Sequence, residues 1–546
     1  MPARSDADVA SNDAAIGISQ AEGGRLQSPK VVRGVVARER ANSGGSIITT
    51  TSERLVEWGA FIDGSWRPDA AGDHFAVLEP STGQQLALVQ ACGADEVDAA
   101  VRSAGSAFAD WAARPVGERA ELLRQVAELI RVHADDLAEL ECRENGKPRR
   151  DARMFDINYA HATFDYFAKL IGEVETEVLA QGPIEARVVR EPYGVVGAIL
   201  PFNWPPIHFA AKCAPALAAG NTVVIKPGEQ APLTVLRMVE LANEVLPPGV
   251  LNAVPGLEAG VALAAHPGIS RITFTGASNT GRRVMKSAAE NLTLPMLELG
   301  GKNALLVFAD ADLDVALTSA LEGLYFNQGE ACTATSRLLV QDEVYDEFVE
   351  RFAAATERLV VGDGLDDATD VGPMVDQRQQ RRVNEYIEIG IGEGARLVAQ
   401  GTTPDDERLR DGFFVAPTVF ADVLPAMRIA QEEIFGPVAC FIRFSTEDEA
   451  IEIANGTPYG LTAALFTGDA GRAERVAGRL EAGMVFVNNY FRASLLGSPF
   501  GGVKDSGFGR EGAPETLLEY TRSKNVRFPS EHTPIPVWES VRRVLS

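Results

Sequence analysis

Short apolar runs alternate with amphipathic stretches from residue 193 onward, and this pattern decides the expected fold. The runs GVVGAILP, NTVVIKPG, GVLNAVPG and ISRITFTG have the length and composition of buried strands. Among them, APLTVLRMVELANEV and NTGRRVMKSAAE have the spacing of amphipathic helices. Strands and helices that alternate in this way predict βαβ units and a parallel sheet covered on both faces.

A second set of the same kind begins at Asn303. It contains the strand-like runs NALLVFAD and SRLLVQ and the helical stretch ADLDVALTSALEGLYFN. A further helix carries Val344, Phe348 and Phe352. The two sets meet near residues 300 to 303, so we expect an α/β protein with two α/β domains.

The chain before residue 193 is mainly helical in pattern. GERAELLRQVAELIRVHADDLAEL predicts one helix with Leu122, Val126, Leu129, Ile130 and Leu137 on its apolar face. The helix should end at Asn145-Gly146, which is followed by Pro148. Residues 1–53 are rich in Ala, Ser, Gly and Arg without periodicity, and we expect a disordered extension.

Composition excludes some classes of function. A formal net charge of −25 argues against nucleic acid and anionic membranes as partners, because both bind basic surfaces. Five scattered cysteines without a C-x-x-C pair suggest no disulfide framework and no metal site. Together they favour a reducing, cytoplasmic location.

Single motifs suggest chemistry but leave alternatives open. Cys332 lies in FNQGEACTATS, and a lone cysteine is either a nucleophile or inert. Glu298 lies in the apolar segment LELGGKN and is either a paired structural acid or a base with a raised pKa. FTGASNTG, residues 274–281, joins a strand to a helix and suits phosphate as well as an ordinary glycine turn. Lys226 and Glu229 follow a strand, where either a ligand or solvent could meet them.

Taken together, these segments resemble the aldehyde dehydrogenase superfamily from about residue 54 onward. Eight segments in order carry the resemblance: PFNWP, KPGE, FTGASNTG, LELGGKN, FNQGEAC, EEIFGPV, NNYF and SPFGGVKDSGFGRE. It implies a Rossmann-like NAD-binding domain at 54–301, interrupted by an oligomerisation segment at 172–190. It also implies a catalytic domain at 302–511 and a C-terminal oligomerisation strand at 512–530. The two oligomerisation pieces imply a small β flap and a homodimer or homotetramer.

The resemblance also assigns roles to matching positions. Cys332 matches the nucleophile, Glu298 the acid that activates the deacylating water, Asn203 the oxyanion donor, and Lys212 a lysine linked to proton movement. The cofactor positions are Lys226, Glu229, Gly276, Ser278, Gly281, Glu433 and Phe435. The implied reaction is oxidation of an aldehyde to the acid through a thiohemiacetal, hydride transfer and a thioester that water hydrolyses.

Two choices within the family follow from single acids. Branches that pass the acyl group to coenzyme A lack an acid at the position of Glu298, so its presence favours hydrolysis. Glu229 suits a free ribose 2′-hydroxyl and should repel a 2′-phosphate, which favours NAD over NADP. A silent relative is disfavoured, because Cys332, Glu298 and Asn203 are all present.

The resemblance implies a small-molecule aldehyde as the substrate. The expected lining is mostly apolar or aromatic and favours an aliphatic or aromatic aldehyde: Trp204, Ile207, Phe209, Ala211, Tyr325, Ala331, Thr333 and Arg492. Arg492 is the exception, because it could pair with a carboxylate and admit a semialdehyde.

Two positions depart from the expected pattern. Ala277 follows the first glycine of the phosphate turn, where many members have serine, and Ser278 comes one place later. Glu330 adds a carboxylate two residues before Cys332 and would raise the thiol pKa if it faced the sulfur. We expect Glu330 to point away.

Overall fold

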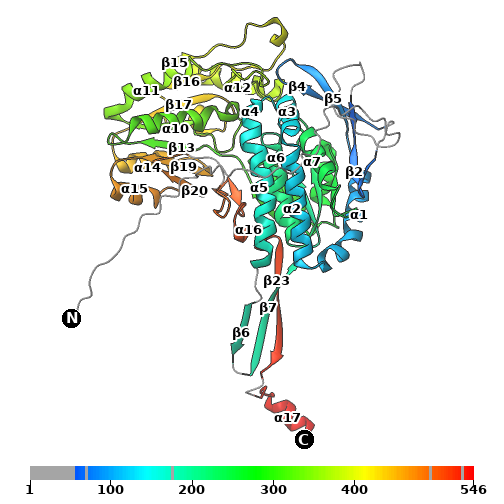
Figure 1. The fold of residues 1–546 in the computed structure, drawn as a ribbon. Coiled ribbons are helices and arrows are strands. Elements are labelled where there is room, and N and C mark those ends of the chain that lie inside the picture. The colour runs from blue at the N-terminus through cyan, green and yellow to red at the C-terminus, as the bar shows by residue number, and fades with distance from the viewer. Residues whose placement is uncertain (1–55, 68–71, 174–176, 182, 491–494, 531–533) are drawn as a thin grey trace, which may run out of the picture. The chain divides into compact units, whose positions relative to one another are not determined.

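The computed structural model describes residues 56–67, 72–173, 177–181, 183–490, 495–530 and 534–546. Two predictions lie outside these ranges, the disordered segment 1–53 and the substrate contact Arg492. Within them, the strands form two large sheets and three small ones, with helices packed on the large sheets (Figure 1). The predicted α/β class is confirmed.

The first large sheet contains the strands predicted between residues 193 and 298. In spatial order its strands are β22 (Gly507–Phe508), β12 (Leu294–Glu298), β11 (Arg271–Thr275), β8 (Val195–Ile199), β9 (Thr222–Lys226), β10 (Leu251–Ala253), β2 (Ala60–Ile62) and β3 (Ser65–Arg67). The five strands from β12 to β10 are parallel. Every residue of β8, β9 and β11 is buried, as expected for a sheet with helices on both faces. Its helices are α1 (Ala94–Ala113), α6 (Pro205–Ala218), α7 (Leu233–Ala242), α8 (Leu257–Ala265) and α9 (Ser278–Ala289).

The second large sheet contains the strands predicted after Asn303. Its spatial order is β15 (Arg396–Gln400), β16 (Thr418–Ala421), β17 (Val438–Phe444), β14 (Arg337–Gln341), β13 (Ala304–Val307), β19 (Thr462–Phe466) and β20 (Met484–Val487). All neighbours are parallel except β15 and β16. Its helices are α10 (Leu313–Tyr325), α11 (Asp342–Thr356), α12 (Gln377–Gly392), α14 (Glu447–Asn455) and α15 (Ala470–Ala477). The strand β22 crosses the expected boundary at residue 301, because it pairs with β12 of the first sheet.

The prediction of a single helix from residue 117 to Asn145 is wrong. The chain forms α2 (Val116–Val132) and α3 (Ala134–Asn145), with a break at His133, where φ is −95° and ψ is 17°. The expected C-terminal stop is confirmed, because Gly146 is left-handed with φ 95°. The sequence predicted Leu122 on the apolar face, but in α2 Leu123 is the buried leucine and Leu122 is half-buried.

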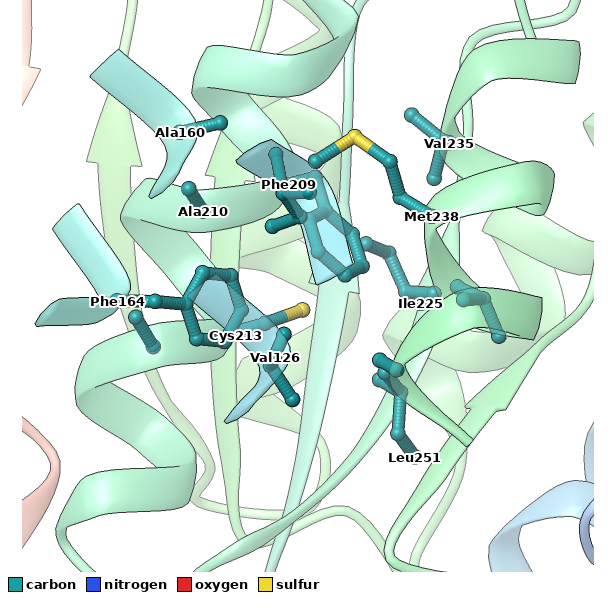
Figure 2. Packing of buried hydrophobic residues seen from close by; sticks show 14 of the residues in the cluster. Val126, Ala160, Phe164, Phe209, Ala210, Cys213, Ile225, Val235, Met238 and Leu251 are labelled. Carbon is teal, nitrogen blue, oxygen red and sulfur yellow. The ribbon is translucent and has the colours of Figure 1, made fainter. Parts of the chain in front are cut away.

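Each large sheet and the helices packed on it form one lobe, the first around the sheet that contains β8 and the second around the sheet that contains β13. The core of the first lobe lies between the helices α2, α5 (Asn158–Leu170), α6 and α7 and the strand β9. Figure 1 shows α2 and α5 side by side. Figure 2 shows Phe209 and Cys213 of α6 in this core, close to Ile225 and Met238. The Phe209 and Phe164 ring centroids are 5.7 Å apart, and Phe209 is fully buried. The prediction of Phe209 as a substrate contact is therefore wrong, because the ring points into the hydrophobic core.

The two predicted oligomerisation segments pair with one another. β23 (Thr521–Pro529), β7 (Ile184–Pro192) and β6 (Glu177–Gln181) form an antiparallel sheet, in that order (Figure 1). Val178, Leu179 and Phe528 are exposed on it. A partner can cover the exposed edge strands of such a sheet, but the oligomeric state stays a prediction.

The remaining elements are short. They are β1 (Val56–Trp58), β5 (Gln84–Gln90), β4 (His74–Glu79), β18 (Tyr459–Gly460), β21 (Val503–Lys504), α4 (Arg149–Asp151), the π-helix η1 (Ala152–Ile157), η2 (Ile171–Glu173), η3 (Phe326–Gly329), η4 (Glu407–Leu409), α13 (Arg428–Gln431), α16 (Pro514–Glu519) and α17 (Glu539–Leu545). Of the helices that the structure describes, none is long and apolar enough to cross a membrane.

Candidate active site

A cleft of about 780 Å³ lies at the carboxyl ends of the first sheet. Ligands of open α/β sheets bind at this edge. The cleft wall includes Asn203, which follows β8, and Gly276 and Ser278, which follow β11. Cys332, Glu433 and Phe435 come from the second lobe. Residues more than 230 positions apart therefore share one cavity.

Cys332 is half-buried in this cleft, whereas the other four cysteines are buried. The loop before it has three consecutive residues with positive φ, Asn327 at 54°, Gln328 at 46° and Gly329 at 76°. The Asn303 side chain donates to the carbonyl oxygen of Cys332 at 2.8 Å. Burial raises the pKa of the thiol to about 12, and the nearby Glu433 and Glu298 carboxyls add to the shift. The resting sulfur is therefore a thiol that needs a positive charge or a base to become a nucleophile.

Glu298 is the last residue of β12 and is almost completely buried. Both of its carboxyl oxygens lack a hydrogen-bond partner among the described residues. Burial raises the pKa of this carboxyl well above its ordinary value, Glu511 raises it further, and Lys212 opposes both. A buried acid with free oxygens and a raised pKa is suited to proton transfer near neutral pH.

Lys212 lies next to this acid on the buried face of α6. Its ammonium donates to Glu511 at 2.7 Å and to Thr273 at 3.3 Å. Glu511 was not predicted as a site residue, although it ends the motif SPFGGVKDSGFGRE. Its signal was weak in the sequence, because only the fold brings it within reach of Lys212, 299 residues away.

Asn203 presents its side-chain amide to the same cleft. Its Nδ2 donates to the carbonyl oxygen of Glu330 at 3.0 Å. The expectation that Glu330 points away from the thiol is confirmed. Its carboxylate accepts from the Val375 backbone N–H at 3.3 Å and from Gln328 at 3.1 Å.

The N-terminus of α9 offers a phosphate site. Its N-cap residue Ala277 makes no side-chain capping bond, so the first N–H groups of the helix stay available to an anion. The Ser278 hydroxyl is not available, because it donates to the Asp505 carbonyl at 2.8 Å. A Cβ on Gly281 would lie 2.6 Å from the Leu299 side chain, so glycine is needed for the close packing of α9.

Glu433 and Phe435 line the cleft together with Cys332, and the Glu433 carboxyl is near the Cys332 thiol. A Glu433 carboxylate oxygen accepts from the Gly301 N–H at 3.1 Å. Burial raises the pKa of Glu433 to about 7. Phe435 has a φ of 65° and meets Phe202 edge-on at 5.9 Å between centroids.

Lys226 and Glu229 form an ion pair with one another at the end of β9. Neither lines the cleft beside Cys332. Burial lowers the pKa of Lys226, and Glu229 opposes the shift. The structure therefore places the two residues of this pair together but outside the lining of the cleft that contains Cys332.

The predicted substrate contacts are placed differently from one another. Trp204 stacks on Phe326 at 5.7 Å and 17°. Ile207 is half-buried and Ala211 is buried on the following helix. The prediction for Tyr325 is wrong, because its hydroxyl bonds to Thr356 at 2.9 Å inside the core of the second lobe.

A dinucleotide fits this set of residues. The uncapped α9 terminus suits its pyrophosphate, and the cleft connects this terminus with Glu433, Phe435 and Cys332. The cavity has the size of known cofactor sites. Among the described residues, no group of His, Cys, Asp and Glu could hold a metal ion.

Gly301→Ala should damage the site more than Gly300→Ala. A Cβ on Gly301 would lie 2.5 Å from the Cys332 carbonyl oxygen and 2.8 Å from Asn303 Oδ1. We expect a loss of about 1–3 kcal/mol of unfolding free energy, as for other overpacked positions, with a fall in kcat. The atoms nearest to a Cβ on Gly300 belong to the Glu433 carboxylate, a side chain and not the backbone, so this control should mainly raise the KM for the cofactor. Thermal unfolding and steady-state kinetics test the pair, and equal Tm and kcat values for both variants would contradict the expectation.

Comparison with known proteins is consistent with this geometry. The aldehyde dehydrogenase family model matches residues 66–526. An aldehyde dehydrogenase of Didymella fabae is 49% identical over 473 residues, which cover 86% of this chain and 96% of that protein.

Two solved structures are similar as well, and both contain the dinucleotide. PnpE from Pseudomonas sp. WBC-3, in complex with nicotinamide adenine dinucleotide, has a TM-score of 0.85 and 41% identity and covers 88% of this chain and 99% of its own. Betaine aldehyde dehydrogenase from Staphylococcus aureus, in complex with NAD⁺, has a TM-score of 0.83 and 37% identity, with coverage of 86% and 94%. The chain belongs to the aldehyde dehydrogenase family.

Proposed function

We propose that this chain oxidises an aldehyde to the carboxylic acid with NAD, through a thiohemiacetal and a thioester on Cys332. One observation carries the proposal: Cys332 and Asn203 line a single cleft, and near the sulfur lies the buried carboxyl of Glu298, which has no hydrogen-bond partner in the described part of the chain. A nucleophile, a polar donor and a proton acceptor are the three groups that acyl transfer through a thioester requires.

The first half of the reaction depends on Cys332 and Asn203. The thiolate attacks the aldehyde carbon, and the carbonyl oxygen gains negative charge. The Asn203 Nδ2–H and the Cys332 backbone N–H hold that oxygen, and each such donor contributes about 3 kcal/mol to the transition state. Bound NAD would supply the hydride acceptor, and its positive ring would favour the thiolate.

The second half depends on Glu298. Its unpaired oxygens can accept a proton from a water molecule, which then attacks the thioester carbon and releases the acid. The neighbouring Lys212 and Glu511 pair acts on the pKa of this carboxyl, which Glu511 raises and Lys212 lowers, and so on how readily Glu298 gains and loses that proton. The first half therefore ends with the thioester on Cys332, and hydrolysis in the second half breaks the C–S bond and returns Cys332 to the thiol.

A panel of aldehydes with NAD or NADP, with NADH formation followed by absorbance, tests the proposed activity. NADH should form without coenzyme A, because Glu298 activates water. A requirement for coenzyme A would favour the acylating alternative, and no turnover of any aldehyde would favour a silent relative.

Glu229→Ala should change the cofactor preference. The carboxylate of Glu229 is expected to accept from the ribose 2′-hydroxyl and to repel a 2′-phosphate, so its removal should narrow the kcat/KM ratio of NAD to NADP by about 10-fold. Kinetics with both cofactors measure the ratio. An unchanged ratio would show that the Lys226 and Glu229 pair does not select the cofactor.

The substrate class is proposed as apolar, either aliphatic or aromatic. The stacked rings of Trp204 and Phe326 beside Asn203 support an apolar aldehyde. A semialdehyde held by Arg492 is the alternative. Matched aldehydes with and without a terminal carboxylate separate the two alternatives. An enzyme for semialdehydes should have the higher kcat/KM with the aldehyde that carries the carboxylate, and an enzyme for apolar aldehydes should have the higher kcat/KM with the other.

Assembly and location are also proposed. The exposed apolar residues on the sheet of β6, β7 and β23 support a homodimer or homotetramer built through that sheet. Five free cysteines support a reducing, cytoplasmic location.

A further inference from the structure

His208 lies in the first turn of α6, five residues after Asn203 and buried beneath it. Its Nε2 is 3.3 Å from the side-chain oxygen of Asn203. The residue had no role in the sequence-based prediction, which selected Ile207 and Phe209 on either side of it. Its contact with a proposed oxyanion donor makes it more than a core residue.

The hydrogen bonds around Asn203 decide which nitrogen of His208 carries the proton. Asn203 Nδ2 faces the Glu330 carbonyl oxygen, which can only accept. Asn203 Oδ1 therefore faces the imidazole, and because this oxygen can also only accept, His208 Nε2 must donate. In the neutral ring Nδ1 is then an acceptor, and it is buried with no partner among the described residues.

The imidazole stays neutral in this position. Burial lowers the pKa of His208 well below its ordinary value, and the ammonium groups of Lys212 on α6 and Lys147 after α3 lower it further. Protonation would also place an unsatisfied N–H at the buried Nδ1, which costs free energy. Nε2–H is therefore the stable donor toward Asn203.

The Asn203 backbone is held as firmly as its side chain. Its carbonyl oxygen accepts from Lys147 Nζ at 3.1 Å and from Asn327 at 3.0 Å. Lys147 is itself fixed by Glu141 at 2.7 Å and Asp156 at 2.9 Å. With its Oδ1, its O and one Nδ2 hydrogen engaged, Asn203 keeps one amide hydrogen without an acceptor in the described chain.

We propose that His208 is a positioning residue, whose Nε2–H holds the Asn203 amide so that its remaining hydrogen faces the developing oxyanion. The inference rests on the proposed function, in which Asn203 is that donor. Without the imidazole, Asn203 Oδ1 loses the only side-chain donor that it has among the described residues, and the amide is free to rotate. Misplacement of a preorganised donor lowers the rate because it acts only in the transition state.

The test uses four variants of the full chain: His208→Leu, His208→Gln, Asn203→Ala and the double variant Asn203→Ala/His208→Leu. Loss of the donor in Asn203→Ala should lower kcat by about 10²–10³-fold. Misplacement of the donor in His208→Leu should lower kcat less, by about 10-fold. KM for NAD should not change in His208→Leu. His208→Gln keeps an N–H donor and should recover most of the rate. The double variant should be no slower than Asn203→Ala alone, because residues that act through one another are not additive.

Cys213→Ala serves as the structural control. Cys213 is fully buried on the same helix and packs in the core shown in Figure 2. Its truncation should lower the Tm without lowering kcat. Comparison with His208→Leu then separates the effect of poorer packing of α6 from the effect of a misplaced Asn203 amide.

The outcomes distinguish the two levels of the argument. If Asn203→Ala keeps the full kcat, the proposed oxyanion role fails, and the inference fails with it. If Asn203→Ala is slow but His208→Leu keeps its kcat, or the double variant shows the product of both losses, His208 does not act through Asn203 and only the inference is overturned. A kcat of His208→Gln as low as that of His208→Leu would also overturn the inference, because the glutamine keeps an N–H donor.

Discussion

Cys332→Ser should lower aldehyde oxidation by about 10⁴-fold or more, as removal of an enzyme nucleophile does. Burial raises the pKa of the Cys332 thiol to about 12, so its ionisation depends on a nearby positive charge or a base. A serine hydroxyl ionises far less readily and is a weak nucleophile without a dedicated base. The rate of NADH formation with the best aldehyde of the panel measures the loss.

The serine variant should otherwise resemble the parent protein. The side chain is half-buried, so Tm and NAD binding should stay within error. A variant that folds, binds NAD and still turns over at more than a small fraction of the parent rate would rule out Cys332 as the nucleophile.

Glu298→Gln should separate the two halves of the reaction. Glutamine cannot accept the proton of water, so thioester hydrolysis should slow by about 10²–10⁴-fold, the usual contribution of a general base. Hydride transfer comes earlier and should persist. Rapid mixing should therefore show a burst of about one NADH for each active site and then a nearly flat line. A variant that loses the burst and the steady state equally would contradict this division.

The same variant has an expected effect of pH on stability. The carboxyl has a higher pKa in the folded chain than its ordinary value of 4.5. Above that ordinary value the unfolded chain releases the proton more readily, so Glu298 lowers stability as the pH rises toward the folded pKa. Glu298→Gln should therefore raise the Tm at neutral pH more than at acidic pH. An acid that costs stability in the native fold is a usual sign of a functional site.

The pattern of hydrophobic residues was enough to predict the two parallel sheets, because buried strands such as Val195–Ile199 are apolar at every position. Asn203 and Glu298 received their roles through the resemblance to the aldehyde dehydrogenase family. The fold shows why they meet: Asn203 follows β8, Glu298 ends β12, and parallel strands bring their carboxyl ends to one edge. The motif around Cys332 completed the set.

Other features depend on contacts that the local sequence does not encode. The break at His133 divides one continuous helical pattern, and no glycine or proline marks it. Tyr325 is in a segment next to the nucleophile loop, yet its hydroxyl bonds to Thr356 in the core. The roles of His208 and Glu511 depend on partners that only the folded chain supplies.

The pairing of β22 with β12 has a consequence for biosynthesis. Glu298 pairs with Gly507, and Glu511 follows four residues later. A ribosome makes the other strands of the first sheet, up to β12, long before it reaches residue 507. Until then β12, which ends at Glu298, is an edge strand of the nascent chain that is unpaired on one side. Contacts so far apart in sequence form late. We expect truncations that end before residue 507 to leave β12 unpaired on one side, and such chains to aggregate rather than to fold as a free cofactor domain.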